Sequence, residues 1–529
     1  MKILVAEPMS PAAVARLKQH AEWEIIVSNP KEYEPYLADC DALLVRSAVK
    51  VTPAVLAKAP KLRVIGRAGV GVDNVDLDAA TEAGVLVMNT PGGNAVSVAE
   101  HTLALMLALA RAVPAATAST TSGKWEKKKF LGHELRGKTL GILGLGNIGQ
   151  EVERRARGFE MRVLAVDPFV SSRTAKDLGV DLVDLETLYR DSDYISLHVG
   201  LTPETRGMIN TAAIAKMKDG VRIINCARGE LVDSAAVAEA LKSGKIAGAG
   251  LDVFDPEPLP ATDPLLGAPN LVATPHIAGS TEEAQEIVGL RIVDQLVEYL
   301  ENGIAINAVN MPAVTVEQYQ AVGPFVTLAE RLGSFAAHIA TGNPRALRLT
   351  YRGKVAEMNT SLVRNAALAG ALNRWLSNRA NLVNAMQLAA QRHLDVAEAH
   401  EAHDGHIDTV RVELETDTGV TSVSGAVVLN KPRLLQVDGI PCEAALTGRL
   451  LYLRNLDVPG VIGHVGTVLG NNHINIANFS LGREERPPGA TPLGAVAVVE
   501  VDSPVPDDVL RQLRGHAAVK LARVVELGA

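Results

Sequence analysis

The sequence predicts an α/β protein that opens with two parallel-sheet domains and continues with two smaller domains of mixed α and β structure. Three observations lead to this prediction. Short apolar strands alternate with helices up to about residue 301, which is typical of βαβ units. Helices rich in Ala and Leu, followed by alternating strands, occupy residues 306–445. From residue 449 the predicted order is β-α-β-β-α-β.

The first alternating series predicts a domain of residues 1–97 plus 284–305, because a helix at 281–301 is expected to cross back to it. Its predicted strands are residues 3–6, 25–27, 42–45, 64–65 and 85–88, and a helix at 95–111 follows them. The second series predicts a domain of residues 98–283. Its predicted strands are residues 139–143, 162–166, 194–197, 222–225, 249–252 and 271–273, with a helix at 148–158.

Two further domains are expected after residue 305. Residues 306–446 are predicted to form an α+β domain, in which helices at 366–393 precede strands at 409–415 and 421–429. Residues 447–529 are predicted to form a ferredoxin-like domain. Its strands are residues 450–456, 474–481, 495–501 and 519–527, its helices are 461–471 and 507–516, and Pro487-Pro488-Gly489 marks a loop.

The composition is that of a folded protein with a sizeable core. Hydrophobic residues make up 47% of the chain and charged residues 21%, which argues against a disordered chain. The formal net charge of −8 argues against nucleic acid as a partner but leaves room for local basic pockets. Cys40, Cys226 and Cys442 lack the spacing of a disulfide framework or a zinc site, so we expect no metal and a reducing, cytoplasmic location. Neither a signal peptide nor a membrane span is expected.

A glycine-rich loop between a predicted strand and a predicted helix indicates a dinucleotide site. Gly144, Gly146 and Gly149 fit the G-x-G-x-x-G pattern, with Asn147 and Ile148 between the last two. The helix that follows would present backbone N–H groups to a pyrophosphate. Asp167 ends the next strand, where a carboxylate accepts the ribose hydroxyls and repels a 2′-phosphate, so the predicted cofactor is NAD. A glycine turn without a ligand is the alternative.

Three charged or titratable residues follow three later strands of the same domain. Arg228, Glu257 and His276 should meet, because sites in open α/β sheets gather at the carboxyl ends of the strands. His276 is suited to take a hydroxyl proton, Glu257 to orient its ring, and Arg228 to bind a carboxylate. Taken singly, each has a plainer explanation: a structural histidine, a surface turn, or a charge where a helix begins.

These segments, together with residues 45–48, 66–74 and 123–130, resemble the D-2-hydroxyacid dehydrogenase family. The resemblance covers about residues 1–310 and implies two Rossmann-like domains that transfer a hydride between NAD and C2 of a 2-hydroxy acid. It implies that Arg228, Glu257 and His276 are catalytic and that Asp252 holds the nicotinamide carboxamide. The remaining residues implied to line the cofactor are Val70, Val199, Cys226, Ala227 and Gly279.

The substrate is predicted to carry a phosphate. Arg46 and Arg67 follow strands of the first domain and suit a phosphate or a carboxylate, although solvated arginines are the alternative. In the family, the stretch around Lys127 reaches the active site of a neighbouring subunit, so Lys127 is a candidate phosphate contact in a dimer or tetramer. The expected reaction is oxidation of 3-phospho-D-glycerate to 3-phosphohydroxypyruvate, which leads to serine.

The C-terminal residues resemble an ACT domain, a module that binds amino acids. Asp457 and Asn475 are candidates to bind serine as an inhibitor, and a turn residue that begins a helix is the alternative for Asp457. Residues 306–445 resemble an intervening domain that can bind anions in long-form relatives. Arg433 matches one basic position there, but Ala444 and Ala445 stand where another is expected. A glyoxylate or hydroxypyruvate reductase and an NAD(H)-sensing corepressor are the alternative functions, and both usually lack an ACT domain.

Overall fold

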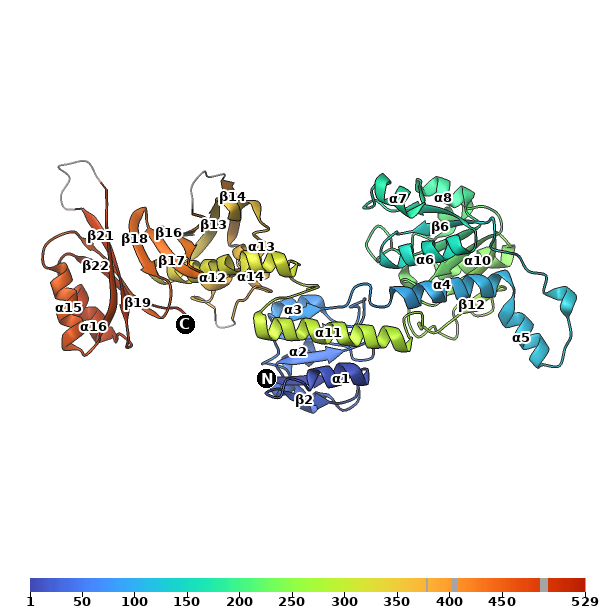
Figure 1. The fold of residues 1–529 in the computed structure, drawn as a ribbon, viewed down its shortest axis with the longest axis horizontal. Helices are drawn as coiled ribbons and strands as arrows, with labels where there is room; N and C mark the ends of the chain where they lie inside the picture. The colour runs from blue at the N-terminus through green and yellow to red at the C-terminus, as the bar shows by residue number, and fades with distance from the viewer. Residues whose placement is uncertain (377–378, 402–406, 486–492, 529) are drawn as a thin grey trace.

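The computed structural model describes residues 1–376, 379–401, 407–485 and 493–528. Four sheets with their helices lie in a row along an elongated molecule (Figure 1). The unit that carries the N-terminus lies between the seven-stranded unit on one side and the two C-terminal units on the other (Figure 1). The predicted fold class is confirmed.

The first unit is a five-stranded parallel sheet in the order β2-β1-β3-β4-β5. Its strands are β1 (Lys2–Val5), β2 (Glu24–Val27), β3 (Ala42–Val45), β4 (Val64–Arg67) and β5 (Leu86–Met88). Its helices are α1 (Pro11–Leu17), α2 (Pro53–Ala57) and α3 (Leu77–Glu82). The long helix α11 (Glu282–Asn302) returns to this unit and buries Ile292 and Leu296 against the sheet core.

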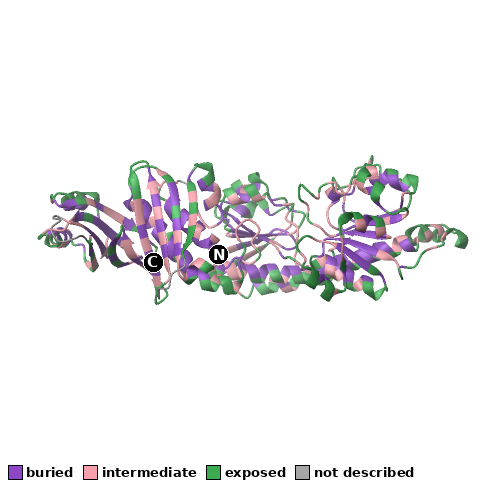
Figure 2. Cartoon of the chain, turned by 90° about the horizontal axis from the view of Figure 1, so that it is seen from above, coloured by how far each residue is buried: buried purple, intermediate pink, exposed green. Residues whose placement is uncertain are grey.

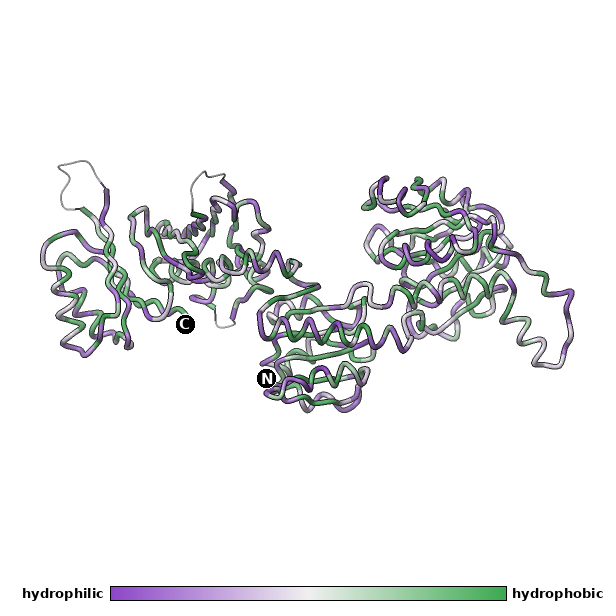
Figure 3. The backbone as a smooth tube through the Cα atoms, viewed as in Figure 1, coloured by the Kyte–Doolittle hydropathy of each residue, from purple (hydrophilic) through white to green (hydrophobic). Residues whose placement is uncertain are grey.

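The second unit is a seven-stranded parallel sheet in the order β12-β11-β10-β9-β6-β7-β8. Its strands are β6 (Thr139–Leu143), β7 (Arg162–Val166), β8 (Asp181–Leu182), β9 (Tyr194–Leu197), β10 (Val221–Asn225), β11 (Ile246–Leu251) and β12 (Leu271–Ala273). Its helices are α4 (Ala95–Ala110), α6 (Asn147–Gly158), α7 (Ser172–Leu178), α8 (Leu185–Asp191), α9 (Thr211–Lys216) and α10 (Ser234–Ser243). Helices cover both faces, which is why the central residues of most strands are apolar (Figure 3).

The third unit differs most from the prediction. Its six-stranded sheet has the order β14-β13-β15-β16-β17-β18, and the predicted helices at 366–393 correspond to two helices, the first of which begins five residues earlier and the second of which ends at residue 391. The strands are β13 (Pro344–Arg352), β14 (Asp395–Glu401), β15 (Thr409–Thr416), β16 (Gly419–Val428), β17 (Lys431–Val437) and β18 (Ile440–Ala445). The helices are α12 (Val316–Ile339), α13 (Ser361–Leu372) and α14 (Ala385–Gln391). The sequence prediction missed α12 because Gly323 and Pro324 in its first half normally interrupt a helix.

The fourth unit is the expected ferredoxin-like sheet, in the order β20-β21-β19-β22. Its elements are β19 (Arg449–Leu456), α15 (Val461–Asn471), β20 (Ile476–Arg483), β21 (Gly494–Val501), α16 (Asp507–Arg514) and β22 (Val519–Glu526). The helices cover one face. The other face joins the core of the third unit, where Tyr452 packs edge-on against Phe335 of α12 with ring centroids 5.9 Å apart. The predicted loop Pro487-Pro488-Gly489 lies outside the described residues.

One helix stands away from every sheet. Helix α5 (Val113–Thr121) has no buried residue and projects from the second unit with the segment after it (Figures 1 and 2). In the part of the chain that the structure describes, no single helix is long and apolar enough to span a membrane. Helices α4 and α5 together have the length and apolar composition of a membrane span, but they are bent by 63° relative to each other.

Candidate active site

The glycine loop connects β6 to α6 and is open on one side. Gly144 has a φ of +92°, and a Cβ there would lie 2.6 Å from the His198 carbonyl oxygen. A Cβ on Gly149 would collide with the Gly144 carbonyl oxygen, whereas a Cβ on Gly146 would meet no atom within 4 Å. No side chain caps the start of α6, so the backbone N–H groups of its first turn can receive a pyrophosphate. Asn147 begins this helix, and Ile148 packs against the core of the unit.

Asp167 lies directly after β7, beside the glycine loop. One carboxylate oxygen accepts the Leu145 N–H at 2.8 Å, and the other accepts the Phe169 N–H at 2.8 Å. Asp167 therefore fixes the loop that would hold the pyrophosphate. Each oxygen keeps a second lone pair, which can accept a ribose hydroxyl.

Glu257 and His276 form a direct hydrogen-bonded pair. His276 Nδ1 lies 2.8 Å from Glu257 Oε2, and Glu257 Oε1 accepts the Phe254 N–H at 3.0 Å. The backbone of His276 has a φ of +54° and its N–H donates to the Asp252 carbonyl at 2.8 Å. The imidazole is thus oriented through Nδ1, while 53% of the side chain is exposed. Nε2 is left for a substrate hydroxyl.

Arg228 follows β10, the strand next to β11 in the sheet. A Cβ on the following residue, Gly229, would lie 2.6 Å from the Asp255 nitrogen and closer still to the Phe254 carbonyl, so the two loops touch. The Asn225 side chain braces the turn by donating to the Arg228 carbonyl at 2.8 Å. Because β10, β11 and β12 are adjacent and parallel, the residues that follow them gather at one edge of the sheet.

Asp252 supports the segment that carries His276. Its side chain is fully buried, and its oxygens accept hydrogen bonds from Thr274 Oγ1 at 2.6 Å and from the N–H groups of Ile277 at 2.9 Å and Ala278 at 2.8 Å. Burial alone would raise the pKa of Asp252, but the hydrogen bonds from His101, Thr274 and the backbone outweigh it and lower the pKa. The structure therefore gives Asp252 a bracing role, and its contact with the nicotinamide stays a prediction.

Of the other residues expected to line the cofactor, Val199, Cys226, Ala227 and Gly279 follow strands of this sheet, whereas Val70 lies in the loop after β4 of the first unit. Asn89 donates to the Val70 carbonyl at 2.5 Å, and the Val199 side chain would lie 3.0 Å from a Cβ on Gly144. Cys226 and Ala227 follow β10, and burial raises the pKa of Cys226 to about 12, so its thiol stays protonated. Gly279 follows the His276 segment, and a Cβ there would lie 2.7 Å from Asn94 Nδ2.

Arg46 lies in a loop that the buried carboxylate of Glu7 holds. Glu7 is 4% exposed and accepts the N–H groups of Arg46 at 2.8 Å, Ala48 at 3.1 Å and Val49 at 2.8 Å. Asn74 donates to the carbonyls of Arg46 and Val49, so it joins this loop to the loop after β4. Glu7 was not among the predicted site residues, although an acid two residues after the apolar strand β1 was a usable signal.

Arg67 is half-buried, and its buried Nε has no hydrogen-bond partner among the described residues. Burial lowers its pKa, the charge of Arg228 lowers it further, and Asp73 and Glu7 act in the opposite direction. Arg46 also lowers it. The charges of Arg46 and Arg228 thus both act on Arg67, opposed by those of Asp73 and Glu7, and this excess of nearby positive charge favours an anionic ligand between the first two units.

Lys127 is not brought to these residues within the chain. It lies in the exposed turn η2 (Lys127–Lys129), in the projecting segment after α5. Trp125 is 85% exposed and Leu131 is 91% exposed in the same segment, which leaves large apolar side chains without cover.

Asp457 and Asn475 lie at opposite ends of the C-terminal sheet. Asp457 N–H donates to Leu493, just before β21 begins, whereas Asn475 Nδ2 donates to Asp502, just after β21 ends. The strand between them has eight residues, so roughly 30 Å separates the two positions. One small effector cannot contact both residues within a single chain.

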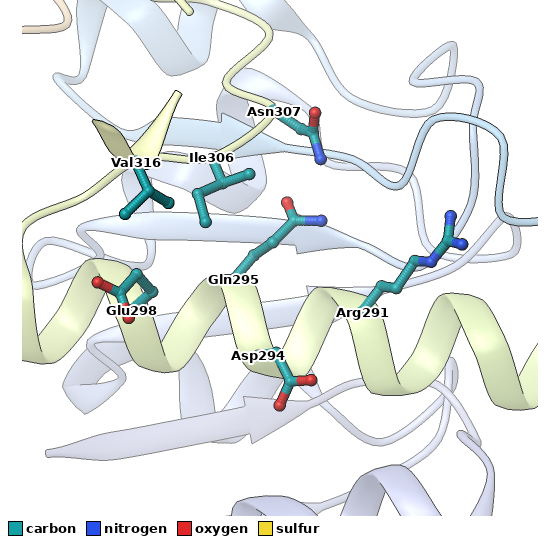
Figure 4. A pocket seen from close by; sticks show the side chains of 7 residues that line it. All are labelled: Arg291, Asp294, Gln295, Glu298, Ile306, Asn307 and Val316. Atoms are coloured by element: carbon teal, nitrogen blue, oxygen red, sulfur yellow. The ribbon is translucent and has the colours of Figure 1, made fainter. Parts of the chain in front are cut away.

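A hollow of about 520 Å³ lies elsewhere, between α11 and the segment of residues 306–316 (Figure 4). Its lining residues are Arg291, Asp294, Gln295, Glu298, Ile306, Asn307 and Val316. None of the predicted catalytic, cofactor or substrate residues lines it. His20, Glu22 and Glu301 form the one group of possible metal ligands found in the described ranges, and it is a surface ion pair in which His20 Nδ1 lies 3.0 Å from Glu301.

The fold and this site define an NAD-dependent dehydrogenase. The NAD-binding domain of D-isomer specific 2-hydroxyacid dehydrogenases matches residues 103–278. The intervening domain of D-3-phosphoglycerate dehydrogenase matches residues 321–438, and the ACT domain matches residues 449–517. The chain belongs to the D-2-hydroxyacid dehydrogenase family, in the long form with an intervening and an ACT domain, which confirms the predicted family.

Several relatives that match this chain over its full length are named D-3-phosphoglycerate dehydrogenase. A D-3-phosphoglycerate dehydrogenase of Methanocaldococcus jannaschii is 42% identical over 529 residues and covers 100% of both chains. That of Bacillus subtilis is 37% identical over 528 residues and covers 99% of each. Among solved structures, D-lactate dehydrogenase of Escherichia coli matches 58% of this chain and 100% of its own with a TM-score of 0.51 and 34% identity. A glyoxylate reductase of Paecilomyes thermophila matches 58% and 98% with a TM-score of 0.52 and 31% identity.

Proposed function

We propose that this chain catalyses the NAD-dependent oxidation of 3-phospho-D-glycerate to 3-phosphohydroxypyruvate, the first step of serine biosynthesis. The observation that carries the proposal is the group of Arg46, Arg67 and Arg228 at the junction of the first two units. A substrate with a carboxylate and a phosphate supplies the negative charge that this group lacks. The names of the full-length relatives support the same substrate.

The proposed mechanism assigns one task to each residue. Arg228 binds the carboxylate and His276 Nε2 takes the proton of the C2 hydroxyl. Glu257 fixes the imidazole through Nδ1 and stabilises the imidazolium that forms. NAD, when held at the glycine loop, would supply the hydride acceptor for this oxidation. Arg46 and Arg67 bind the phosphate, and Asp167 and the glycine loop hold the cofactor.

The four units are proposed as domains with these boundaries: residues 1–97 plus 284–305 bind substrate, 98–283 bind NAD, 306–446 intervene and 447–529 regulate. The chain is proposed to form a homo-oligomer, a dimer or a tetramer. The exposed α5 segment would dock on a second copy, which covers Trp125 and Leu131 and brings Lys127 to the partner's phosphate site. Three free, buried cysteines suit a cytoplasmic location.

Serine is proposed as a feedback inhibitor at the ACT domain. Because Asp457 and Asn475 are far apart in one chain, the effector would bind between the ACT domains of two chains, with one residue from each. Anion binding at the intervening domain is less favoured, because Arg433 lies 3.2 Å from Glu443 and has its charge balanced.

The substrate is tested by steady-state reduction of 3-phosphohydroxypyruvate, hydroxypyruvate and glyoxylate, followed at the NADH absorbance band. The proposal predicts the highest kcat/KM for 3-phosphohydroxypyruvate. Equal values for the three acids would refute the phosphate assignment. Serine added to the intact enzyme should inhibit, and loss of that inhibition in Asn475→Ala would locate the effect.

A further inference from the structure

The loops after β4 and β10 are joined by an ion pair between the first two units. Asp73 Oδ2 lies 3.1 Å from Arg228 Nη2, and the Asp73 side chain is 69% exposed whereas that of Arg228 is 29% exposed. A Cβ on Gly71 would lie 2.7 Å from Asp73 Oδ2 and would collide with the Arg228 guanidinium. The loop backbone is therefore packed against this ion pair. The predicted site included Arg228 but not Asp73.

Asp73 is the carboxylate in this region that can move. Glu7 is buried and committed to three backbone N–H groups. Asp73, by contrast, is exposed and makes no other hydrogen bond or ion pair in the described parts of the chain. Arg228 Nη1 already donates to the Ala227 carbonyl at 2.8 Å, so Nη2 is the guanidinium nitrogen that Asp73 occupies. A substrate carboxylate that binds Arg228 competes for this same nitrogen.

We propose that Asp73 is the counter-ion of Arg228 in the substrate-free enzyme and that the substrate carboxylate displaces it. The inference rests on the proposed function in one respect, that Arg228 binds the substrate carboxylate. Displacement breaks a link between the two units each time substrate binds. Because the free energy of the Asp73–Arg228 ion pair is lost when a carboxylate binds, the enzyme binds any carboxylate more weakly by that amount. Asp73 therefore affects KM without taking part in the hydride step.

The test measures carboxylate binding in an Asp73→Asn variant. Oxalate, which cannot be reduced, is titrated by calorimetry into enzyme saturated with NADH. An exposed ion pair contributes about 0.2–1 kcal/mol, so oxalate should bind up to about five-fold more tightly to the variant. The KM for the 2-oxo acid that the wild type reduces should fall by a similar factor, with kcat and the Kd for NADH unchanged. Unchanged or weaker oxalate binding would overturn the proposal.

Two controls separate this role from a general effect of charge or folding. Asp78→Asn removes the same charge from an exposed position in α3 and should leave oxalate binding unchanged; an equal gain there would overturn the proposal. In an Arg228→Gln background, where the cation is absent, the Asp73→Asn effect should disappear, and its persistence would also overturn the proposal. If Asp73→Asn folds poorly by circular dichroism, Asp73→Ser replaces it.

Failure of the proposed function and failure of the proposed role of Asp73 would be seen in different measurements. A wild type that reduces another 2-oxo acid but shows no preference for the phosphorylated one refutes the substrate, while the oxalate titration still decides the role of Asp73.

Discussion

Alanine substitutions at two glycines of the nucleotide loop should impair different properties, cofactor binding in one case and folding stability in the other. Gly146 has a φ of −75° and a ψ of −160°, a conformation open to alanine, and its Cβ would meet no protein atom within 4 Å. Gly149 begins the close approach of α6 to the loop, and its Cβ would collide with the Gly144 carbonyl oxygen and lie 3.4 Å from Ile142 Cγ2. We therefore expect Gly146→Ala to affect the ligand and Gly149→Ala to affect the fold.

The magnitudes follow from these contacts. Forcing an extra carbon into a packed site costs about 1–3 kcal/mol. For a domain of about 150–250 residues, each kcal/mol of lost unfolding free energy lowers Tm by about 2–4 °C. The Tm of Gly149→Ala should therefore lie roughly 2–12 °C below that of the wild type. Gly146→Ala should keep the wild-type Tm. If its methyl group removes one charge-assisted hydrogen bond to the pyrophosphate, worth about 1.5–3 kcal/mol, the Kd for NADH rises about ten- to hundred-fold.

The assay combines thermal unfolding without ligand and NADH titration by fluorescence on the same three proteins. Wild-type NADH affinity in Gly146→Ala would refute the position of the pyrophosphate over this loop. A Tm of Gly146→Ala as low as that of Gly149→Ala would refute the separation of the two roles.

Three further predictions concern single side chains. His276→Ala should abolish turnover and leave the Kd for NADH within about two-fold, because its imidazole faces the substrate and not the loop; loss of NADH binding like that of Gly146→Ala would contradict its role. Asp167→Ala should narrow the preference for NAD over NADP, because the carboxylate that repels a 2′-phosphate is gone; an unchanged ratio of kcat/KM for the two cofactors would contradict it. Asp252→Asn should lower Tm, because the hydrogen bonds to the 274–278 segment weaken. Since the folded pKa of Asp252 is lowered, the charged carboxylate stabilises the fold above the unfolded pKa of about 3.9. The Tm difference from wild type should therefore be constant above about pH 5 and shrink as the pH falls below that pKa, and a difference that grows in acid would contradict the assignment.

The parts of the site that depend on local patterns could be predicted from the sequence. Gly144, Gly146 and Gly149 lie between a strand and a helix, and Arg228, Glu257 and His276 each follow a strand of one parallel sheet. Strand ends meet at one edge of such a sheet, so their convergence follows from topology alone. The structure shows in addition that Glu257 and His276 are in direct hydrogen-bond contact.

The parts that depend on distant pairs could not be predicted. The Asp73–Arg228 pair joins residues of two different units, and no periodicity relates them. The shared core of the third and fourth units was also missed, although a signal existed. Leu450, Leu451, Tyr452 and Leu453 are all buried, and an uninterrupted apolar strand indicates a sheet covered on both faces. Removing residues 449–529 would expose this core, so point variants are the better test of serine control.

The preference for a phosphate tests the central claim most directly. 3-Phosphohydroxypyruvate and hydroxypyruvate differ only in the phosphate, so the ratio of their kcat/KM values isolates the contribution of the arginine group. We expect a ratio of at least about ten in the wild type, since one charge-assisted contact contributes about 1.5–3 kcal/mol, and a clear fall of that ratio in Arg46→Ala. A wild-type ratio near one, or a ratio that Arg46→Ala leaves unchanged, would contradict it.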